Sequence, residues 1–242
     1  MEVLYSHCAG LDVHKMTVVV CRLGVDAKGH KVKATETFGT ATAELLHGGP
    51  ETCGVVTSGG TESCLLAVKT YRDLARATRG VRKPEMVLPT TAHVAWFKAS
   101  EYFGVKLRLL PLDDKLHADV SKLESMINRR TVMVLGSAPE YPHGSIDPIE
   151  AMGAIAQKHG IPMHVDACVG GYLAPFARRL GRPVPEFDFA LPGVRSISAD
   201  LHKYGFAPKG ISILLQRRRE LRDAQYYTCA TWTGYSIINS TT

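Results

Sequence analysis

Short apolar segments of strand length alternate with longer segments of helical spacing from about residue 45 to residue 215. Residues 131–135 are apolar after Thr131, as in strands that are buried on both faces of a parallel sheet. Residues 61–77 carry apolar side chains three and four positions apart, as in a helix that packs one face against such a sheet. This alternation predicts an α/β fold with a mostly parallel sheet, whose ligands bind at the carboxyl ends of the strands.

The predicted elements follow one another in a regular order. Strands are expected at residues 85–88, 105–110, 131–135, 162–165, 196–199 and 211–215. Helices are expected at residues 61–77, 92–103, 119–128 and 147–158, the last with Asp147 as its cap and Pro148 in its first turn.

The first 43 residues have a different pattern. Residues 17–23 and 30–38 favour strands, and residues 24–29 between them supply turn residues. This predicts a β-hairpin with a longish loop. We therefore expect a short N-terminal hairpin segment, residues 1–43, followed by one α/β domain, residues 44–242.

Charge and cysteine content limit the classes of function. The formal net charge is +6, and basic clusters surround Arg178 and Arg217. These clusters lack the interleaved aromatic residues of a base-stacking surface, so we interpret them as solvated faces and expect no nucleic-acid partner. The six cysteines form no C-x-x-C pair, and no metal site is expected. No apolar run is long enough to span a bilayer, so we expect a cytoplasmic chain with reduced thiols.

A glycine-rich segment, residues 57–63, lies just before the first predicted helix of the domain. Gly59 and Gly60 allow a ligand to come close to the backbone. The hydroxyls of Ser58 and Thr61, together with N–H groups at a helix start, suit a phosphate group. The alternative is a turn in which Ser63 or Thr61 caps the helix.

Three further side chains lie near predicted strand ends. His93 can stack on an aromatic ligand or be structural. Asp166 ends a buried strand, where its carboxylate needs a partner such as a protonated pyridine nitrogen, or caps a helix. Lys203 follows the 196–199 strand and is expected to have a lowered pKa that makes it a nucleophile, unless it is a surface lysine. A phosphate cradle, a stacking ring, a carboxylate and a nucleophilic lysine are together what a protein must supply to pyridoxal 5'-phosphate.

Residues 45–236 resemble the sphingosine-1-phosphate lyase family, within the group II decarboxylase-like, aspartate-aminotransferase (fold type I) enzymes. The matching stretches are LLHGGPETCGVVTSGGTES (45–63), PTTAHVAWFKA (89–99), GSAPEYPHGSIDPI (136–149), HVDACVGGYLAPF (164–176) and SISADLHKYGFAPKG (196–210).

The resemblance implies a role for each candidate residue. Lys203 bonds covalently to pyridoxal phosphate, Asp166 pairs with its ring nitrogen, and His93 stacks on the ring. The phosphate lies against residues 58–61, which are Ser58, Gly59, Gly60 and Thr61, with a further contact from His202.

The resemblance also implies an activity. A carbon–carbon lyase would cleave a small phosphorylated amino-lipid, sphinganine or sphingosine 1-phosphate, to a fatty aldehyde and phosphoethanolamine. The alternative is a pyridoxal-phosphate amino-acid decarboxylase, which shares the same lysine, aspartate and histidine. The catalytic base is left open among Tyr204, His202 and Lys209. A homodimer is expected.

The N-terminal segment resembles a different family. HCAGLDVHKMTVVVCRL (7–23) and TFGTATAEL (37–45) are similar to the start of insertion-sequence transposases with a RuvC-like domain. By that resemblance Asp12 is the first of four metal-binding acidic residues, and we expect the other three to be absent and no nuclease activity. Alternatives are a simple edge hairpin and a nucleic-acid-binding remnant. We also expect the lyase family's N-terminal segment and small C-terminal domain to be missing, and hence weak cofactor binding and little turnover, or a non-functional fragment.

Overall fold

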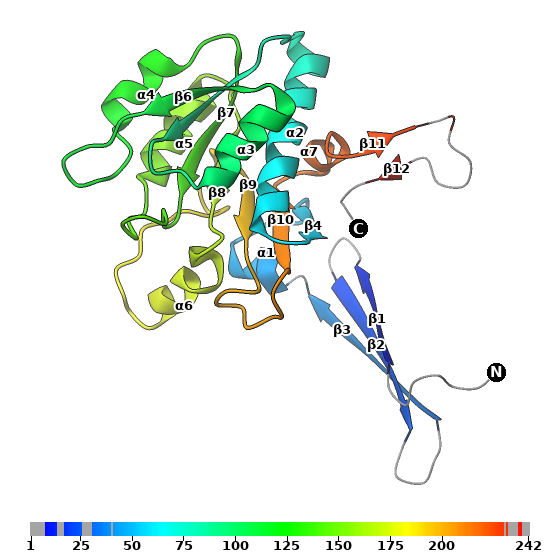
Figure 1. Ribbon diagram of the computed structural model, residues 1–242. Coiled ribbons are helices and arrows are strands. Elements are labelled where there is room, and N and C mark those ends of the chain that lie inside the picture. Colours follow the sequence, from blue (N-terminus) through cyan, green and yellow to red (C-terminus); the bar gives the residue numbers. More distant parts are fainter. Residues whose placement is uncertain are drawn as a thin grey trace.

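The computed structural model describes residues 8–13, 17–25, 31–39, 41–229, 231 and 237–238. A seven-stranded sheet lies between helices on both of its faces (Figure 1). Its strand order is β4 (Cys53–Thr57), β10 (Ser212–Gln216), β9 (Val194–Ala199), β8 (Met163–Asp166), β7 (Thr131–Ser137), β5 (Glu85–Pro89) and β6 (Lys106–Leu110). The helices are α1 (Ala41–Leu45), α2 (Gly60–Arg79), α3 (Val94–Phe103), α4 (Val120–Met126), α5 (Ile149–Lys158), η1 (Gly170–Tyr172), α6 (Ala174–Arg179) and α7 (Arg219–Asp223).

The predicted mostly parallel sheet is confirmed. Strands β9, β8, β7, β5 and β6 pair in parallel, whereas β10 is antiparallel to both of its neighbours. A parallel pairing needs a long crossover, but residues 200–211 between β9 and β10 contain no helix, so the chain returns antiparallel. This connection, beyond the carboxyl end of β9, carries Lys203.

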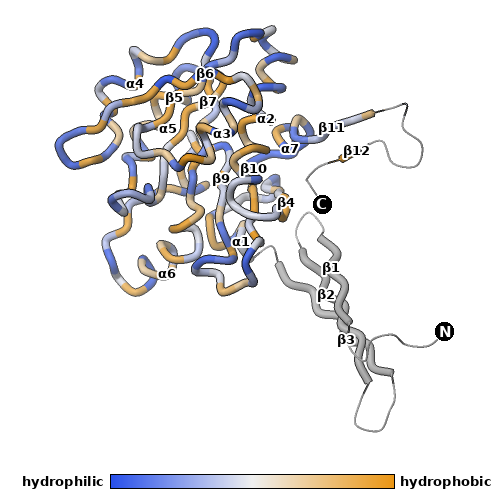
Figure 2. The backbone as a smooth tube through the Cα atoms, viewed as in Figure 1, coloured by the Kyte–Doolittle hydropathy of each residue, from blue (hydrophilic) through white to orange (hydrophobic). Residues whose placement is uncertain are grey.

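Alternate residues along the strands face two separate hydrophobic cores. On β5, Met86 and Leu88 pack with α2 and α3, whereas Val87 packs with α4 and α5 on the other face. Figure 2 shows the apolar residues following these central strands. Because both faces are covered, β5 and β7 are buried along their whole length, which fixes the strand ends that hold the site.

The predicted strands and helices of the domain are all present, with ends shifted by a few residues. The prediction that Asp147 caps α5 is wrong. The carboxylate of Asp147 instead accepts the N–H groups of Ser137 (2.8 Å) and Ala118 (3.0 Å). The residue before α5 is Pro148, and no side chain caps this helix. Strand β4 and helices α1, α6 and α7 were not predicted.

The expected hairpin is present as β2 (Thr17–Val25) and β3 (Lys31–Gly39), paired antiparallel. A third strand that the sequence did not predict, β1 (Cys8–Val13), pairs with β2. A short antiparallel pair, β11 (Tyr227–Thr228) and β12 (Ile237–Ile238), lies near the other end of the chain. The side chain of Asp12 lies outside the described part of the structure.

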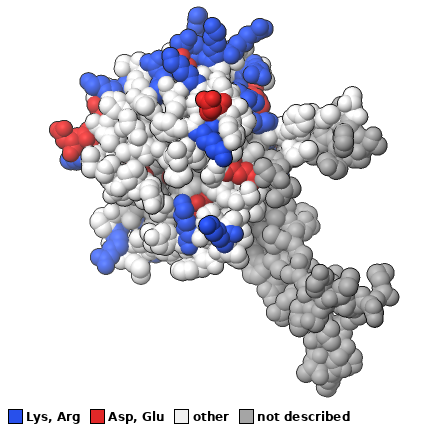
Figure 3. Space-filling view, in the orientation of Figure 1, with Lys and Arg blue, Asp and Glu red and all other residues white. Residues whose placement is uncertain are grey.

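The interpretation of the basic clusters as solvated faces is wrong for two arginines. Arg217 is half-buried and donates to three backbone carbonyl groups, those of Val194, Leu191 and Phe189. Arg178 is half-buried as well and pairs with Glu186. Basic side chains gather instead over the C-terminal end of α2, at the top of Figure 3. None of the described helices has both the length and the apolar character that crossing a bilayer requires.

Candidate active site

A cavity of about 520 Å³ opens at the carboxyl ends of the strands. It brings together all the residues that the sequence singled out for a cofactor, although they come from four separate segments. These residues are Ser58, Gly59, Gly60, Thr61, His93, Asp166, His202 and Lys203.

The glycine segment joins β4 to α2 on one side of the cavity. Gly59 has a φ of 141°, a conformation that residues with a Cβ rarely adopt. No side chain caps the helix there, so the capping alternative is wrong; instead, the Glu62 carboxylate accepts the N–H of Ser58 at 2.6 Å. The 20-residue helix α2 therefore begins at the cavity, and the positive end of its dipole favours an anion there.

Gly60, the first residue of α2, makes the closest packing contact of this segment. A Cβ at this position would lie 2.8 and 2.9 Å from the two carboxylate oxygens of Asp200 and 3.0 Å from the Sγ of Cys168. Only glycine fits without moving these neighbours. Glycine at this position therefore allows the backbone of the segment to lie against the Asp200 carboxylate.

His93 has a structural role that the sequence left open. Its Nδ1 accepts the N–H of Ala95 at 3.1 Å, so the side chain caps α3. The exposed ring also lines the cavity and meets the ring of Tyr141 edge-on, with 6.4 Å between the centroids. Capping therefore fixes the imidazole at the cavity wall.

Asp166 ends β8 and is 7% exposed. Its Oδ2 accepts the indole N–H of Trp96 at 2.8 Å, and its Oδ1 accepts the N–H of Cys168 at 3.1 Å. A carboxylate has about four acceptor positions, so these two bonds leave room for a further donor from the cavity. Behind it, His164 packs against Trp96, and burial lowers the pKa of this histidine to about 4, which keeps the ring uncharged at neutral pH.

Lys203 lies on the connection between β9 and β10, with its Nζ 3.0 Å from the Oδ2 of Asp200. Burial alone would lower the pKa of Lys203, but the hydrogen bond and the charge of Asp200 outweigh burial and raise it. The predicted lowering of this pKa is therefore wrong. The Nε2 of His202 lies 3.5 Å from the same oxygen, and its Nδ1 donates to the carbonyl of Ile211 at 2.8 Å.

The sequence analysis missed several residues of the cavity wall. Asp200 is the most important, and it belongs to the same SADLHKYG stretch as Lys203. Cys64 and Cys168 hydrogen-bond through their thiols; burial raises the pKa of Cys64, and the bond from Cys64 raises that of Cys168. Tyr204, a candidate base, lines a different cavity of about 450 Å³ with apolar walls.

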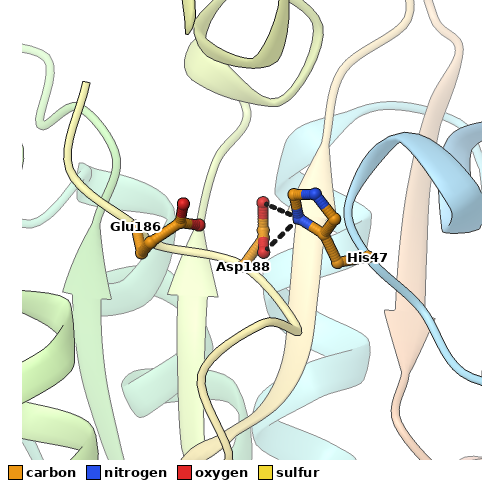
Figure 4. Close-up of side chains that lie close together, drawn as sticks. All are labelled: His47, Glu186 and Asp188. Carbon is orange, nitrogen blue, oxygen red and sulfur yellow. Dashed lines mark hydrogen bonds and ion pairs between the residues drawn. The ribbon is translucent and has the colours of Figure 1, made fainter. Parts of the chain in front are cut away.

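A second polar cluster lies outside this cavity, where His47, Glu186 and Asp188 place possible metal-ligand atoms within 4.8 Å of one another (Figure 4). Asp188 is fully buried, and both its oxygens lie 3.0 Å from the Nδ1 of His47. Arg178 pairs with Glu186 at 3.0 Å and lies 3.8 Å from Asp188. A guanidinium already balances these carboxylates, so the cluster is an ion-pair network that ties His47 to the segment before β9.

The fold and the cavity together define a class of enzyme. A lysine follows one strand, a carboxylate ends the adjacent parallel strand, and a glycine turn opens a helix at the same sheet edge. These are features of the fold-type I enzymes that use pyridoxal phosphate.

Comparison with known proteins agrees with this class. The pyridoxal-dependent decarboxylase conserved domain matches residues 32–234, and the chain belongs to this family. The match begins within β3, so it includes part of residues 1–43, which were expected to be a separate N-terminal segment.

Several relatives are sphingosine-1-phosphate lyases. The rice (Oryza sativa) protein is 50% identical over 193 residues, which cover 80% of this chain and 36% of the relative. The yeast (Saccharomyces cerevisiae) protein is 48% identical over 184 residues, 75% of this chain and 31% of the relative. The chain thus spans about a third of the length of these relatives.

Solved structures of a sphingosine-1-phosphate lyase and of a decarboxylase superpose on this chain. The sphingosine-1-phosphate lyase of Burkholderia pseudomallei superposes with a TM-score of 0.81 at 42% identity, covering 84% of this chain and 49% of that one. The glutamate decarboxylase of Lactobacillus brevis superposes with a TM-score of 0.70 at 23% identity, over 84% of this chain and 49% of that one, which shows the fold alone.

Proposed function

We propose that this chain carries the cofactor-binding part of a pyridoxal-phosphate carbon–carbon lyase that acts on sphinganine or sphingosine 1-phosphate. The observation that carries the proposal is the convergence of Lys203, Asp166 and the Gly59–Gly60 turn on one cavity. The identity of 42–50% with proteins named sphingosine-1-phosphate lyase supports this substrate class.

The residues of the cavity fit pyridoxal phosphate. In the proposed arrangement, Gly60 and Thr61 at the start of α2 hold the phosphate, with Ser58, Gly59 and His202 beside it. Lys203 holds the aldehyde carbon. When bound, the cofactor supplies an electron sink for the bond that breaks in the substrate.

Asp166 keeps a negative charge at the ring nitrogen and so keeps a proton there, because the charges attract. The bonds from Trp96 and the Cys168 backbone hold this carboxylate in one orientation. His93 holds the ring from one side. These contacts orient the group without themselves taking part in bond breakage.

Substrate binding and proton transfer fall to other residues of the wall. Lys98 and Lys209 line the cavity and supply positive charge for the phosphate of the substrate. For the proton on the substrate hydroxyl, His202 and Lys209 stay candidates, and Tyr141 joins them because its exposed hydroxyl-bearing ring lines the cavity. Tyr204 is the weakest candidate because it lines the other cavity.

An assay with two readouts tests the proposal against the decarboxylase alternative. Purified chain loaded with pyridoxal phosphate is given sphinganine 1-phosphate in one reaction and glutamate in another. Release of a fatty aldehyde supports the lyase. Release of carbon dioxide from glutamate, with no aldehyde from the lipid, would reject it in favour of a decarboxylase.

A homodimer is part of the same proposal. The apolar groove beside the active-site loop is lined by Tyr172, Leu173, Phe176, Tyr204 and Phe206, and Phe206 is 93% exposed. Apolar side chains gathered on one surface favour association, and we assign this surface to a second copy of the chain. Light scattering after gel filtration should give twice the single-chain mass of 26.4 kDa. Phe206→Asp should reduce the measured mass to that of a single chain.

The N-terminal residues 1–43 are proposed as a separate unit derived from a transposase-like sequence. Their three strands pair with each other and with none of the seven strands of the main sheet, within the part of the chain that the structure describes. Removal of residues 1–43 should therefore leave cofactor binding unchanged, as measured by absorbance of the bound cofactor. Loss of binding would show that the segment belongs to the domain.

A further inference from the structure

The carboxylate of Asp200 is buried in the wall of the cavity and only half satisfied. The residue is 3% exposed. Its Oδ2 meets Lys203 Nζ at 3.0 Å and His202 Nε2 at 3.5 Å. Its Oδ1 is buried with no hydrogen-bond partner among the described residues. A buried carboxylate oxygen without a partner is costly, so its position needs an explanation.

Asp200 lies between the lysine and the glycine turn. The position of a Cβ on Gly60 would be 2.8 Å from Oδ1 and 2.9 Å from Oδ2, so the carboxylate lies against the first residue of α2. The start of this 20-residue helix attracts anions, and in the proposed function it holds a phosphate. Two anionic groups would then share one helix start.

On the basis of the proposed function, we propose that Asp200 is a positioning residue that keeps Lys203 charged until a phosphate enters the cavity and then accepts a proton from it. In this step one N–H bond of the Lys203 ammonium breaks and one O–H bond forms on the Asp200 carboxyl group. The positive and the negative charge disappear together, and no other reactant is consumed. The product is a neutral amine, which is the nucleophilic form of lysine.

The arrival of phosphate is the trigger because like charges repel. A phosphate dianion beside an ionised carboxylate disfavours the charged form of the carboxyl group, and protonation removes the repulsion. Without phosphate, Asp200 raises the pKa of Lys203 above its usual value, so even less of the neutral amine that can attack an aldehyde is present at neutral pH. The same ion pair that makes Lys203 unreactive therefore provides the route for its proton.

Other titratable groups face the same space. They are Cys64 and Glu62 on α2, His93 before α3, Lys98 on α3, Glu140 and Tyr141 after β7, Asp166 and Cys168 at the end of β8, and His202 and Lys209 on the loop of Lys203. Asp166 acts on Lys203 through its charge alone, whereas Asp200 also holds its Nζ in a direct hydrogen bond. Replacement of Asp200 should therefore change the pKa and the reactivity of Lys203 more than replacement of any other group in this list.

The test uses pyridoxal, which has the aldehyde but no phosphate, with and without inorganic phosphate. Borohydride reduction followed by mass spectrometry of the Lys203 peptide gives the rate of capture at pH 7. In the unmodified chain, phosphate should accelerate capture by about tenfold or more, as one unit of pKa corresponds to a factor of about ten. In Asp200→Asn, capture should be fast without phosphate, and phosphate should not accelerate it.

Asp113→Asn is the matched control, because Asp113 is not part of the cavity wall and its side chain is 41% exposed. It should behave as the unmodified chain does. The proposal is overturned if Asp200→Asn keeps the acceleration by phosphate, or if it captures pyridoxal more slowly than the unmodified chain when phosphate is absent.

A measurement on the unmodified chain covers the case in which Asp200→Asn does not fold. The rate of pyridoxal capture should rise with pH, and phosphate should move the midpoint of this rise to lower pH; an unmoved midpoint overturns the proposal. Pyridoxal phosphate itself distinguishes the two proposals. If it does not modify Lys203, the proposed function and the role of Asp200 both fail; if it does and phosphate has no effect on pyridoxal, only the role of Asp200 fails.

Discussion

The indole N–H of Trp96 on α3 donates to the Oδ2 of Asp166 at the end of β8, over 2.8 Å. Both groups are buried, and the bond crosses from a helix to the strand end that faces the cavity. The hydrophobic core on this face of the sheet therefore sets the orientation of the carboxylate. This hydrogen bond links the packing of Trp96 in the core to the position of Asp166 in the cavity wall.

Trp96→Phe removes the donor and leaves most of the packing. A buried carboxylate that loses one of its donors should cost about 1–3 kcal/mol of the free energy of unfolding, measured by urea denaturation. Binding of pyridoxal phosphate should weaken as well, because Asp166 is no longer held in place. Tyr71→Phe is the control: it removes a buried bond to Ser196, so it should lower stability and leave cofactor binding unchanged. Equal cofactor affinity in both variants would contradict the role of Trp96.

Lys203→Ala should abolish covalent capture of pyridoxal phosphate. After borohydride reduction, mass spectrometry should find no modified peptide from residues 196–210 of the variant. Lys83→Ala, in an exposed turn before β5, should keep full modification. A reduced adduct of undiminished amount in Lys203→Ala would mean that another amine holds the cofactor.

The sequence predicted the order of strands and helices along the chain well, because patterns of apolar residues depend on local spacing. Residues 132–135 are apolar throughout and form part of β7, which is buried on both faces. The sequence also singled out Lys203, Asp166 and the Gly59–Gly60 turn, which the structure brings together at one cavity, because each follows or precedes a strongly patterned element.

What could not be predicted were the contacts between distant segments. Asp200 raises the pKa of Lys203, and the direction of that effect depends on a distance of 3.0 Å that no local pattern encodes. Arg217 resembled a solvated residue in a basic run, yet it binds three carbonyl groups of the segment before and at the start of β9. Charge along the sequence therefore says little about which charges are buried.

Gly60→Ala tests the close packing of the phosphate segment. The new Cβ would lie 2.8–3.0 Å from the Asp200 carboxylate and the Cys168 thiol, so these groups or the backbone must move. Overpacking of this kind costs about 1–3 kcal/mol, and affinity for pyridoxal phosphate should fall with it. Gly49→Ala is the matched control, because nothing lies within 4 Å of its Cβ position. Tight cofactor binding by Gly60→Ala, titrated by absorbance, would contradict the proposed cradle.

Asp188→Ala should be among the most destabilising substitutions away from the cavity. It leaves His47 without its buried acceptor and Arg178 with Glu186 alone, and leaving such groups without a partner typically costs about 1–3 kcal/mol. Glu124→Ala removes an exposed pair with Lys158, and it should lower the free energy of unfolding much less. Chemical denaturation of the two variants gives the comparison. Similar losses would show that the Asp188 network contributes no more than a surface pair.

The acid sensitivity of the fold should depend on His164. Burial lowers the pKa of this histidine in the folded chain to about 4, from 6.5 in the unfolded chain. Between these values the unfolded chain binds a proton that the folded chain does not, so the free energy of unfolding should fall as the pH is lowered from 6.5 to 4. The loss should approach about 3 kcal/mol, since each unit of pKa corresponds to about 1.4 kcal/mol.

Buried carboxylates such as Glu85, whose pKa is lowered in the folded chain, lose their contribution only at more acidic pH, so they do not explain a slope above pH 5. His164→Gln keeps a polar side chain beside Ser196 and Ser198 but cannot titrate in this range. Urea denaturation at pH 7, 6 and 5 should show a decline for the unmodified chain and a flatter profile for the variant. Parallel profiles for the two chains would show that His164 is not the group responsible.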